Sequence, residues 1–224
     1  MRHETRPAAV LFDMDGTLVD TERLWWDAVE RVAAGLGHRL SSADAPAVLG
    51  RPSDYTADHL RRILGPTAPD PDALARDLDD AFAALVADEV VPRPGVLSLL
   101  DELSRAEIPT AIVTASPRRV VDLVRETLGV DRFTTTIAVE DTVRSKPAPD
   151  PYLAAAAALG VDPHACVAVE DTPVGVAAAE AAGCAVLAVP SVDVPPAPGR
   201  TILKSLEGAD VVFLASLLHP AERS

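Results

Sequence analysis

Short runs of apolar residues alternate along this chain with segments of helical spacing. Such runs, without polar alternation, are typical of strands buried on both faces of a sheet. The expected strands are 8–12, 110–113, 136–139, 166–169 and 185–189, with 211–214 as a sixth candidate. The helical segments between them are 96–106, 117–128, 151–159 and 173–182, and three of these begin at proline, which suits a first helical turn. This alternation predicts an α/β fold with a doubly wound, Rossmann-like parallel sheet and right-handed crossovers.

The stretch from residue 20 to residue 92 breaks the alternation, because nothing in it has the pattern of a strand. Helical patterns occupy 21–36, 57–64 and 71–87. A turn sequence, Pro-Arg-Pro-Gly at 92–95, then marks the return to the sheet. The sequence therefore predicts a core domain made of residues 1–19 and 93–224, with a small helical domain at 20–92 inserted after the first strand.

Charge excludes one broad class of partner. The chain of 224 residues carries a formal net charge of -14, and Lys146 and Lys204 are its only lysines. A nucleic-acid binder needs clustered Lys and Arg, so nucleic acid is not an expected partner. An acidic protein also repels an anionic substrate at long range, so any phosphate site here should carry its own local positive charge.

Compartment and assembly follow from weaker signals. The N-terminal residues lack the apolar stretch of a signal peptide, and no later run approaches the length needed to span a membrane. Cys166 and Cys184 match no metal-ligand spacing and are expected to be buried thiols. We therefore expect a cytoplasmic protein without a membrane partner. A monomer is the expectation for its assembly, and a homodimer stays open.

Polar side chains gather where the predicted strands end. In open α/β sheets, ligands bind beyond the carboxyl ends of the strands. The residues at those ends, together with a lysine that follows the third strand, are Asp13, Thr114, Glu140, Asp141, Glu170, Asp171 and Lys146. Carboxylates crowded at one edge raise one another's pKa unless a cation intervenes, and oxygen ligands beside a phosphate suit Mg²⁺. A magnesium and phosphate site is expected there, with Lys146 as a fixed positive charge.

The first strand end carries the most chemistry. Asp13 can attack phosphorus as a carboxylate nucleophile and form an aspartyl-phosphate. Asp15 can protonate the leaving alkoxide and then deprotonate water. Gly16 allows a sharp turn that brings backbone N–H groups toward phosphoryl oxygens, and Thr114 can donate to one of them.

Plainer interpretations of these residues are a solvated acidic turn, helix caps and a surface lysine. For Glu140 and Asp141 we favour the plain interpretation, which places both carboxylates outside the metal shell.

Four motifs resemble those of the haloacid dehalogenase superfamily of phosphotransferases, in its branch similar to β-phosphoglucomutase with a helical cap. They are Asp13-Met14-Asp15-Gly16-Thr17-Leu18, Val113-Thr114-Ala115-Ser116, Lys146-Pro147 and Val169-Glu170-Asp171-Thr172 with Gly175. A lone Asp-x-Asp is weak, but four motifs in order at successive strand ends are specific. The match spans nearly the whole chain.

The resemblance implies roles for these residues. Mg²⁺ would be held by the Asp13 carboxylate, the Asp15 carbonyl and Asp171, with Glu170 as a direct or water-mediated ligand. The substrate would be bound by Met14, Thr114, the Ala115 N–H and Lys146. The helical insertion would be a cap that closes over the site and selects the substrate, with Trp25, Trp26, Arg51 and Tyr55 as candidate contacts. Tryptophans on a cap helix are more often core or cap-interface aromatics than substrate contacts, and Arg51 could equally be an ordinary loop charge.

The choice of reaction depends on residues that are present and absent. Dehalogenases do not need Asp15, and phosphonate-cleaving relatives need a cap lysine that this chain lacks. Sugar phosphomutases are the main alternative, but in the resemblance Trp25 occupies their histidine position and Thr17 replaces their usual valine. A non-catalytic module that binds a phosphorylated metabolite is the alternative from another class. The sequence therefore favours a Mg²⁺-dependent phosphatase of a small phosphomonoester, with a sugar or polyol phosphate as substrate and an aspartyl-phosphate intermediate.

Overall fold

The computed structural model describes residues 6–191, 193–197 and 199–218 of the chain. It divides into two compact units, residues 1–19 with 92–224 and residues 20–91. The sequence prediction divided the chain one residue later, between 92 and 93. Each unit is built around its own hydrophobic interior.

The larger unit contains a six-stranded sheet in which every pairing is parallel. Its strands are β1 (Ala9–Phe12), β2 (Thr110–Val113), β3 (Thr135–Ile137), β4 (Cys166–Glu170), β5 (Ala185–Ala188) and β6 (Arg200–Ile202). The order across the sheet is β3-β2-β1-β4-β5-β6, so the chain reverses its direction of progress at β1. The predicted doubly wound parallel sheet is confirmed, and its ligand-binding switch point lies beside the end of β1.

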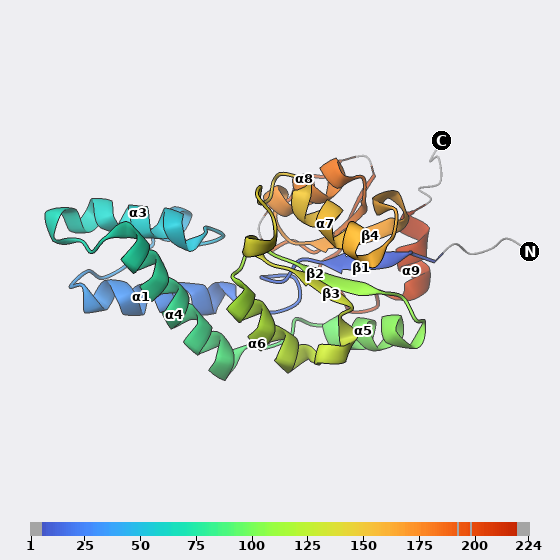
Figure 1. The fold of residues 1–224 in the computed structure, drawn as a ribbon, viewed down its shortest axis with the longest axis horizontal. Helices are drawn as coiled ribbons and strands as arrows, with labels where there is room; N and C mark the ends of the chain where they lie inside the picture. Colours follow the sequence, from blue (N-terminus) through green and yellow to red (C-terminus); the bar gives the residue numbers. More distant parts are fainter. Residues whose placement is uncertain (1–5, 192, 198, 219–224) are drawn as a thin grey trace, which may run out of the picture. The chain divides into compact units, whose positions relative to one another are not determined.

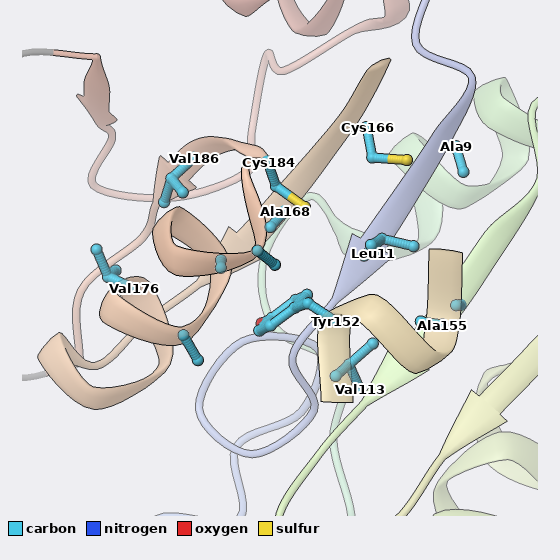
Figure 2. Packing of buried hydrophobic residues seen from close by; sticks show 14 of the residues in the cluster. Ala9, Leu11, Val113, Tyr152, Ala155, Cys166, Ala168, Val176, Cys184 and Val186 are labelled. Carbon is cyan, nitrogen blue, oxygen red and sulfur yellow. The ribbon is translucent and has the colours of Figure 1, made fainter. Parts of the chain in front are cut away.

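Helices cover both faces of this sheet. Figure 1 shows α7 (Asp150–Leu159) and α8 (Pro173–Ala182) on one face, and α5 (Val96–Arg105) and α6 (Arg118–Leu128) on the other. Strand side chains alternate between the two faces, and Ala9 and Leu11 enter the cluster under α7 and α8 that is drawn in Figure 2. Short 3₁₀ turns, η2 (Val130–Arg132), η3 (Val139–Asp141) and η4 (Pro163–Ala165), complete the connections.

The sixth strand candidate, 211–214, was wrong. Those residues begin helix α9 (Val211–Leu217), because the Asp210 carboxylate accepts from the Phe213 N–H at 2.6 Å and so caps a first helical turn. The run is amphipathic rather than buried throughout, since Leu214 is fully buried and Val212 is exposed. The true edge strand, β6, has no apolar run. Strand β3 also ends before Val139, which belongs to η3.

The smaller unit is helical, with α1 (Glu22–Gly35), α2 (Ala45–Val48), α3 (Ser53–Leu64), η1 (Gly65–Thr67) and α4 (Pro71–Glu89). Helices α1 and α3 both pack on α4, and the interior of this unit includes Leu24, Leu60 and Leu78. The sequence prediction missed α2, which is a single turn. Within the part of the chain that is described, no helix is both long enough and apolar enough to cross a membrane.

Both cysteines are buried free thiols, as predicted. Burial raises the pKa of Cys166 to about 11 and that of Cys184 to about 12, so the reactive thiolate is scarce near neutral pH. We expect an aromatic disulfide reagent at about pH 8 to leave both thiols unmodified in the folded protein and to modify both after unfolding in denaturant. Rapid stoichiometric labelling of the folded protein would contradict this placement.

Candidate active site

The C-terminal ends of the central strands bring the predicted residues together. Asp13 follows β1 and Thr114 follows β2, while Glu170 ends β4 and Asp171 comes next; all four side chains are buried. Ladder hydrogen bonds fix the strand ends, since the Asp13 N–H donates to the Val169 carbonyl at 2.9 Å. The switch point of the sheet therefore carries three neighbouring carboxylates.

Lys146 reaches this group from the loop before α7. Its Nζ donates to Asp13 Oδ1 at 2.6 Å, to Glu170 Oε1 at 2.6 Å and to the Val113 carbonyl at 2.9 Å. The side chain is only 7% exposed. Lys146 thus supplies the local positive charge that was predicted from the sequence.

Burial has the largest effect on the pKa values of the site. Burial raises the pKa of the Asp13 carboxyl well above its ordinary value, and Glu170 and Asp171 add to that rise, while Lys146 opposes it. Burial likewise raises the pKa of Asp171 to about 7. Burial alone lowers the pKa of Lys146, but its two carboxylate partners raise it overall. One lysine does not balance three carboxylates, so a further cation would favour their ionised forms.

The three carboxylates fit a metal ion. Asp13, Glu170 and Asp171 each offer one oxygen, and these oxygens lie within 4.8 Å of one another. Asp13 Oδ2 is buried and has no hydrogen-bond partner among the described residues, which is the condition of an atom that awaits a ligand. Carboxylate oxygens are the ligands of hard divalent ions. This acidic triad could therefore hold such an ion.

Asp15 is held by two hydroxyl groups. Its Oδ2 accepts from Ser116 Oγ at 2.7 Å and from Thr114 Oγ1 at 3.0 Å. Thr114 Oγ1 also accepts from the Ser116 N–H at 3.0 Å. The segment after β2 therefore fixes the carboxyl group that the sequence assigned to proton transfer.

Two glycines make room for the acidic side chains. Gly16 has a φ of 84°, and a Cβ there would lie 2.1 Å from Asp171 Oδ2. A Cβ on Gly175 would lie 2.0 Å from Glu170 Oε2. Any larger residue at either position would displace a carboxylate of the site.

Two residues at the site were missed from the sequence. The Tyr152 hydroxyl donates to Glu170 Oε1 at 2.5 Å, and Ser191 Oγ donates to Asp171 Oδ2 at 2.5 Å. Ser191 follows β5, so the strand-end rule would have found it had the fifth strand been included. Tyr152 lies in the first turn of α7, six residues after Lys146, and a tyrosine inside a run of apolar residues was the only signal.

Glu140 and Asp141 both bind Arg118, which favours the plain interpretation of these two carboxylates. The Glu140 carboxylate accepts from the Arg118 N–H at 3.0 Å, at the start of α6, and Asp141 pairs with the Arg118 guanidinium. Neither belongs to the acidic triad. Their charges instead stabilise the N-terminal turn of a helix.

The other predicted contacts have varied surroundings. Met14 is fully buried, and Ala115 is exposed next to Thr114. In the helical unit, the Trp25 indole donates to the Val48 carbonyl at 2.8 Å and is largely buried, which favours the core interpretation. The exposed Arg51 guanidinium lies 4.9 Å from the centroid of the Tyr55 ring. A substrate contact by Met14, Ala115, Trp25 or Arg51 stays a prediction.

This fold and site define an enzyme of the α/β class whose acidic centre lies at the C-terminal edge of a parallel sheet. A family model described as a haloacid dehalogenase-like hydrolase matches residues 7–183. The chain belongs to that family of hydrolases, as the four sequence motifs predicted.

Known relatives agree with this assignment. Hexitol phosphatase A of Escherichia coli (strain K12) is 34% identical over 183 residues, which cover 80% of this chain and 81% of that protein. The crystal structure of CbbY from Rhodobacter sphaeroides in complex with phosphate has a TM-score of 0.81 at 29% identity and covers 93% of this chain and 99% of its own. β-Phosphoglucomutase from Clostridium difficile, with a TM-score of 0.76 at 17% identity and coverage of 96% and 98%, shares the fold.

Proposed function

We propose that this protein hydrolyses a small sugar or polyol phosphate, with Mg²⁺ as its cofactor and Asp13 as the nucleophile. The Asp13 carboxylate carries the proposal: Lys146 Nζ binds Oδ1 at 2.6 Å, and Oδ2 is buried without a partner in the described part of the chain. A carboxylate fixed at one oxygen with the other uncommitted suits attack on phosphorus. A relative named for hexitol supports the substrate class.

The chain offers a set of ligands for the cofactor. Asp13, Asp171 and the Asp15 carbonyl would hold Mg²⁺, with Glu170 binding it directly or through water. Bound there, Mg²⁺ would neutralise the carboxylates and the charge of the phosphoryl group. Lys146 would hold a phosphoryl oxygen together with the Ala115 N–H.

Proton transfer would belong to Asp15. Its carboxyl group would donate to the leaving alkoxide as the Asp13–phosphorus bond forms, and the resulting carboxylate would take a proton from the water that hydrolyses the aspartyl-phosphate. The hydrogen bonds from Thr114 and Ser116 to Oδ2 would keep that carboxyl group in one orientation. The Thr114 hydroxyl group has a single hydrogen, which it donates to Asp15 Oδ2, so it would donate to a phosphoryl oxygen only by giving up that bond.

The mutase alternative requires that a sugar hydroxyl, rather than water, accept the phosphoryl group. No lysine lies between residues 20 and 91, and Trp25 occupies the position where the resemblance places a mutase histidine. The Trp25 N–H is already used by the Val48 carbonyl. These features favour water as the acceptor.

A panel of phosphorylated metabolites tests the proposal. Sugar and polyol phosphates, glucose 1-phosphate isomers and an aryl phosphate would be incubated with Mg²⁺ or with a chelator, and free phosphate and isomerised sugar would be measured. We expect phosphate release that requires Mg²⁺. An isomerised sugar phosphate without free phosphate would establish the mutase, and no turnover across the panel would favour a binding module.

Ser191 offers a prediction about the metal. Ser191→Ala removes the hydroxyl that orients Asp171, so we expect the Mg²⁺ concentration for half-maximal activity to rise about 10-fold, as for other residues that orient metal ligands. Titration of activity with Mg²⁺ measures this. The matched variant Ser205→Ala, which removes a hydroxyl bonded to Glu207, should behave like the wild type. An unchanged Mg²⁺ titration in Ser191→Ala would show that Asp171 needs no such support.

A further inference from the structure

Tyr152 is fully buried, yet its polar end is directed at the site. Its ring lies among the apolar side chains of the cluster under α7 and α8, as Figure 2 shows. The hydroxyl group donates to Glu170 Oε1 at 2.5 Å, and the Lys146 Nζ lies 5.2 Å from the ring centroid. A phenylalanine would fill the same space, so packing alone does not call for the hydroxyl group.

The Glu170 carboxylate is held at both oxygens. Oε1 accepts from the Tyr152 hydroxyl and from Lys146 Nζ, and Oε2 accepts from the Asp171 N–H at 3.2 Å. Gly175 lets this carboxylate lie against the start of α8, where a Cβ would collide with it. The side chain is fully buried, so these protein groups, rather than bulk water, determine its orientation.

Lys146 depends in turn on that orientation. Its Nζ has three acceptors among the described residues, of which the Asp13 and Glu170 carboxylates, both at 2.6 Å, are the charged ones. Charge-assisted bonds of this length are the stronger kind, and they place the ammonium group between the two carboxylates. A chain of contacts therefore runs from the Tyr152 hydroxyl through Glu170 to Lys146 and on to Asp13.

We propose that Tyr152 is a positioning residue, whose hydroxyl group holds Glu170 in the orientation that fixes Lys146 Nζ against Asp13. Without the hydroxyl group, Glu170 Oε1 loses one of its two donors, and the carboxylate is held less firmly. Lys146 then loses its fixed second partner. The catalytic consequence of this loosening rests on the proposed function, but the loosening itself does not.

The chain's two lysines provide a direct measurement. Trace acylation of amines in metal-free protein, followed by peptide mass spectrometry, gives the reactivity of Lys146, whose side chain is buried, relative to the exposed Lys204. In Tyr152→Phe we expect that ratio to rise about 10-fold, the factor that corresponds to losing one hydrogen bond to a charged group. Thr110→Val is the control, since it removes a buried hydroxyl that bonds the Arg132 carbonyl at the opposite end of β2, and its ratio should stay at the wild-type value.

A double mutant tests the route through Glu170. Glu170→Gln should raise the Lys146 ratio, and Tyr152→Phe added to it should raise the ratio no further, because the hydroxyl group acts through that carboxylate. An unchanged ratio in folded Tyr152→Phe would overturn the proposal. Should that variant fail to fold, an unchanged ratio in Glu170→Gln would overturn it equally.

Enzyme activity separates this proposal from the proposed function. Tyr152→Phe should also weaken inhibition by inorganic phosphate, which Lys146 would bind, by about 10-fold. Wild-type protein that turns over no sugar or polyol phosphate, but whose Lys146 ratio responds to Tyr152→Phe, would refute the proposed function and leave the positioning role standing.

Discussion

Asp13→Asn is expected to lower turnover by about 10⁴- to 10⁶-fold, the loss that follows removal of a nucleophile from a covalent mechanism. An amide cannot replace the carboxylate in attack on phosphorus. The protein should stay folded, because Asp13 follows β1 rather than filling the core, and Lys146 keeps Glu170 as its partner. Steady-state rates with a hexitol phosphate, together with circular dichroism of the variant, measure both expectations.

Acid quenching gives the same prediction a chemical readout. Wild-type enzyme stopped during turnover should carry a phosphoryl group on the peptide that contains Asp13, and Asp13→Asn should carry none. Asp122→Asn makes the same change at an exposed position on α6 and should keep wild-type activity. Turnover of Asp13→Asn within about 100-fold of the wild type would contradict covalent catalysis by this residue.

The sheet was largely predictable because burial on both faces removes polar residues from a strand. In β1, all four residues are buried, and the predicted strand, 8–12, begins only one residue before it. The edge strand β6 has no apolar run, because it pairs with β5 alone and its residues are partly exposed. Residues 211–214 were predicted as a strand because an apolar run of four residues does not distinguish a strand from a helical turn. The Asp210 side chain caps this segment and makes it the first turn of a helix.

The site was predictable to the extent that it lies at strand ends. Parallel topology brings the ends of β1, β2 and β4 to one edge, so Asp13, Thr114 and Asp171 could be placed together without coordinates. Tyr152 could not be placed at the site in this way, because its hydrogen-bond partner Glu170 is 18 residues away in the sequence. That hydrogen bond depends on how α7 packs on the sheet. Trp25 shows the same limit, since helical spacing identifies a face but not the partner of an indole N–H.

Asp15→Asn should separate the two chemical steps. An aryl phosphate has a leaving group that needs no proton, so its transfer to Asp13 in a single turnover should stay within a few-fold of the wild-type rate. Transfer from an alkyl phosphate such as a hexitol phosphate should slow by about 10²- to 10⁴-fold, the usual worth of general acid catalysis. Rapid quench of both reactions measures the first step alone.

The second step should slow with either substrate, because the same carboxylate would activate water. Asp15→Asn should therefore accumulate phosphorylated Asp13 from the aryl phosphate, seen as a burst of the aryl alcohol that matches the enzyme concentration. Ser116→Ala is the matched control: it keeps the acid but removes its 2.7 Å hydrogen bond, so its smaller loss should lack the burst. Equal slowing of the first step with both leaving groups would show that Asp15 is not the general acid, and a missing burst would show that it is not the base.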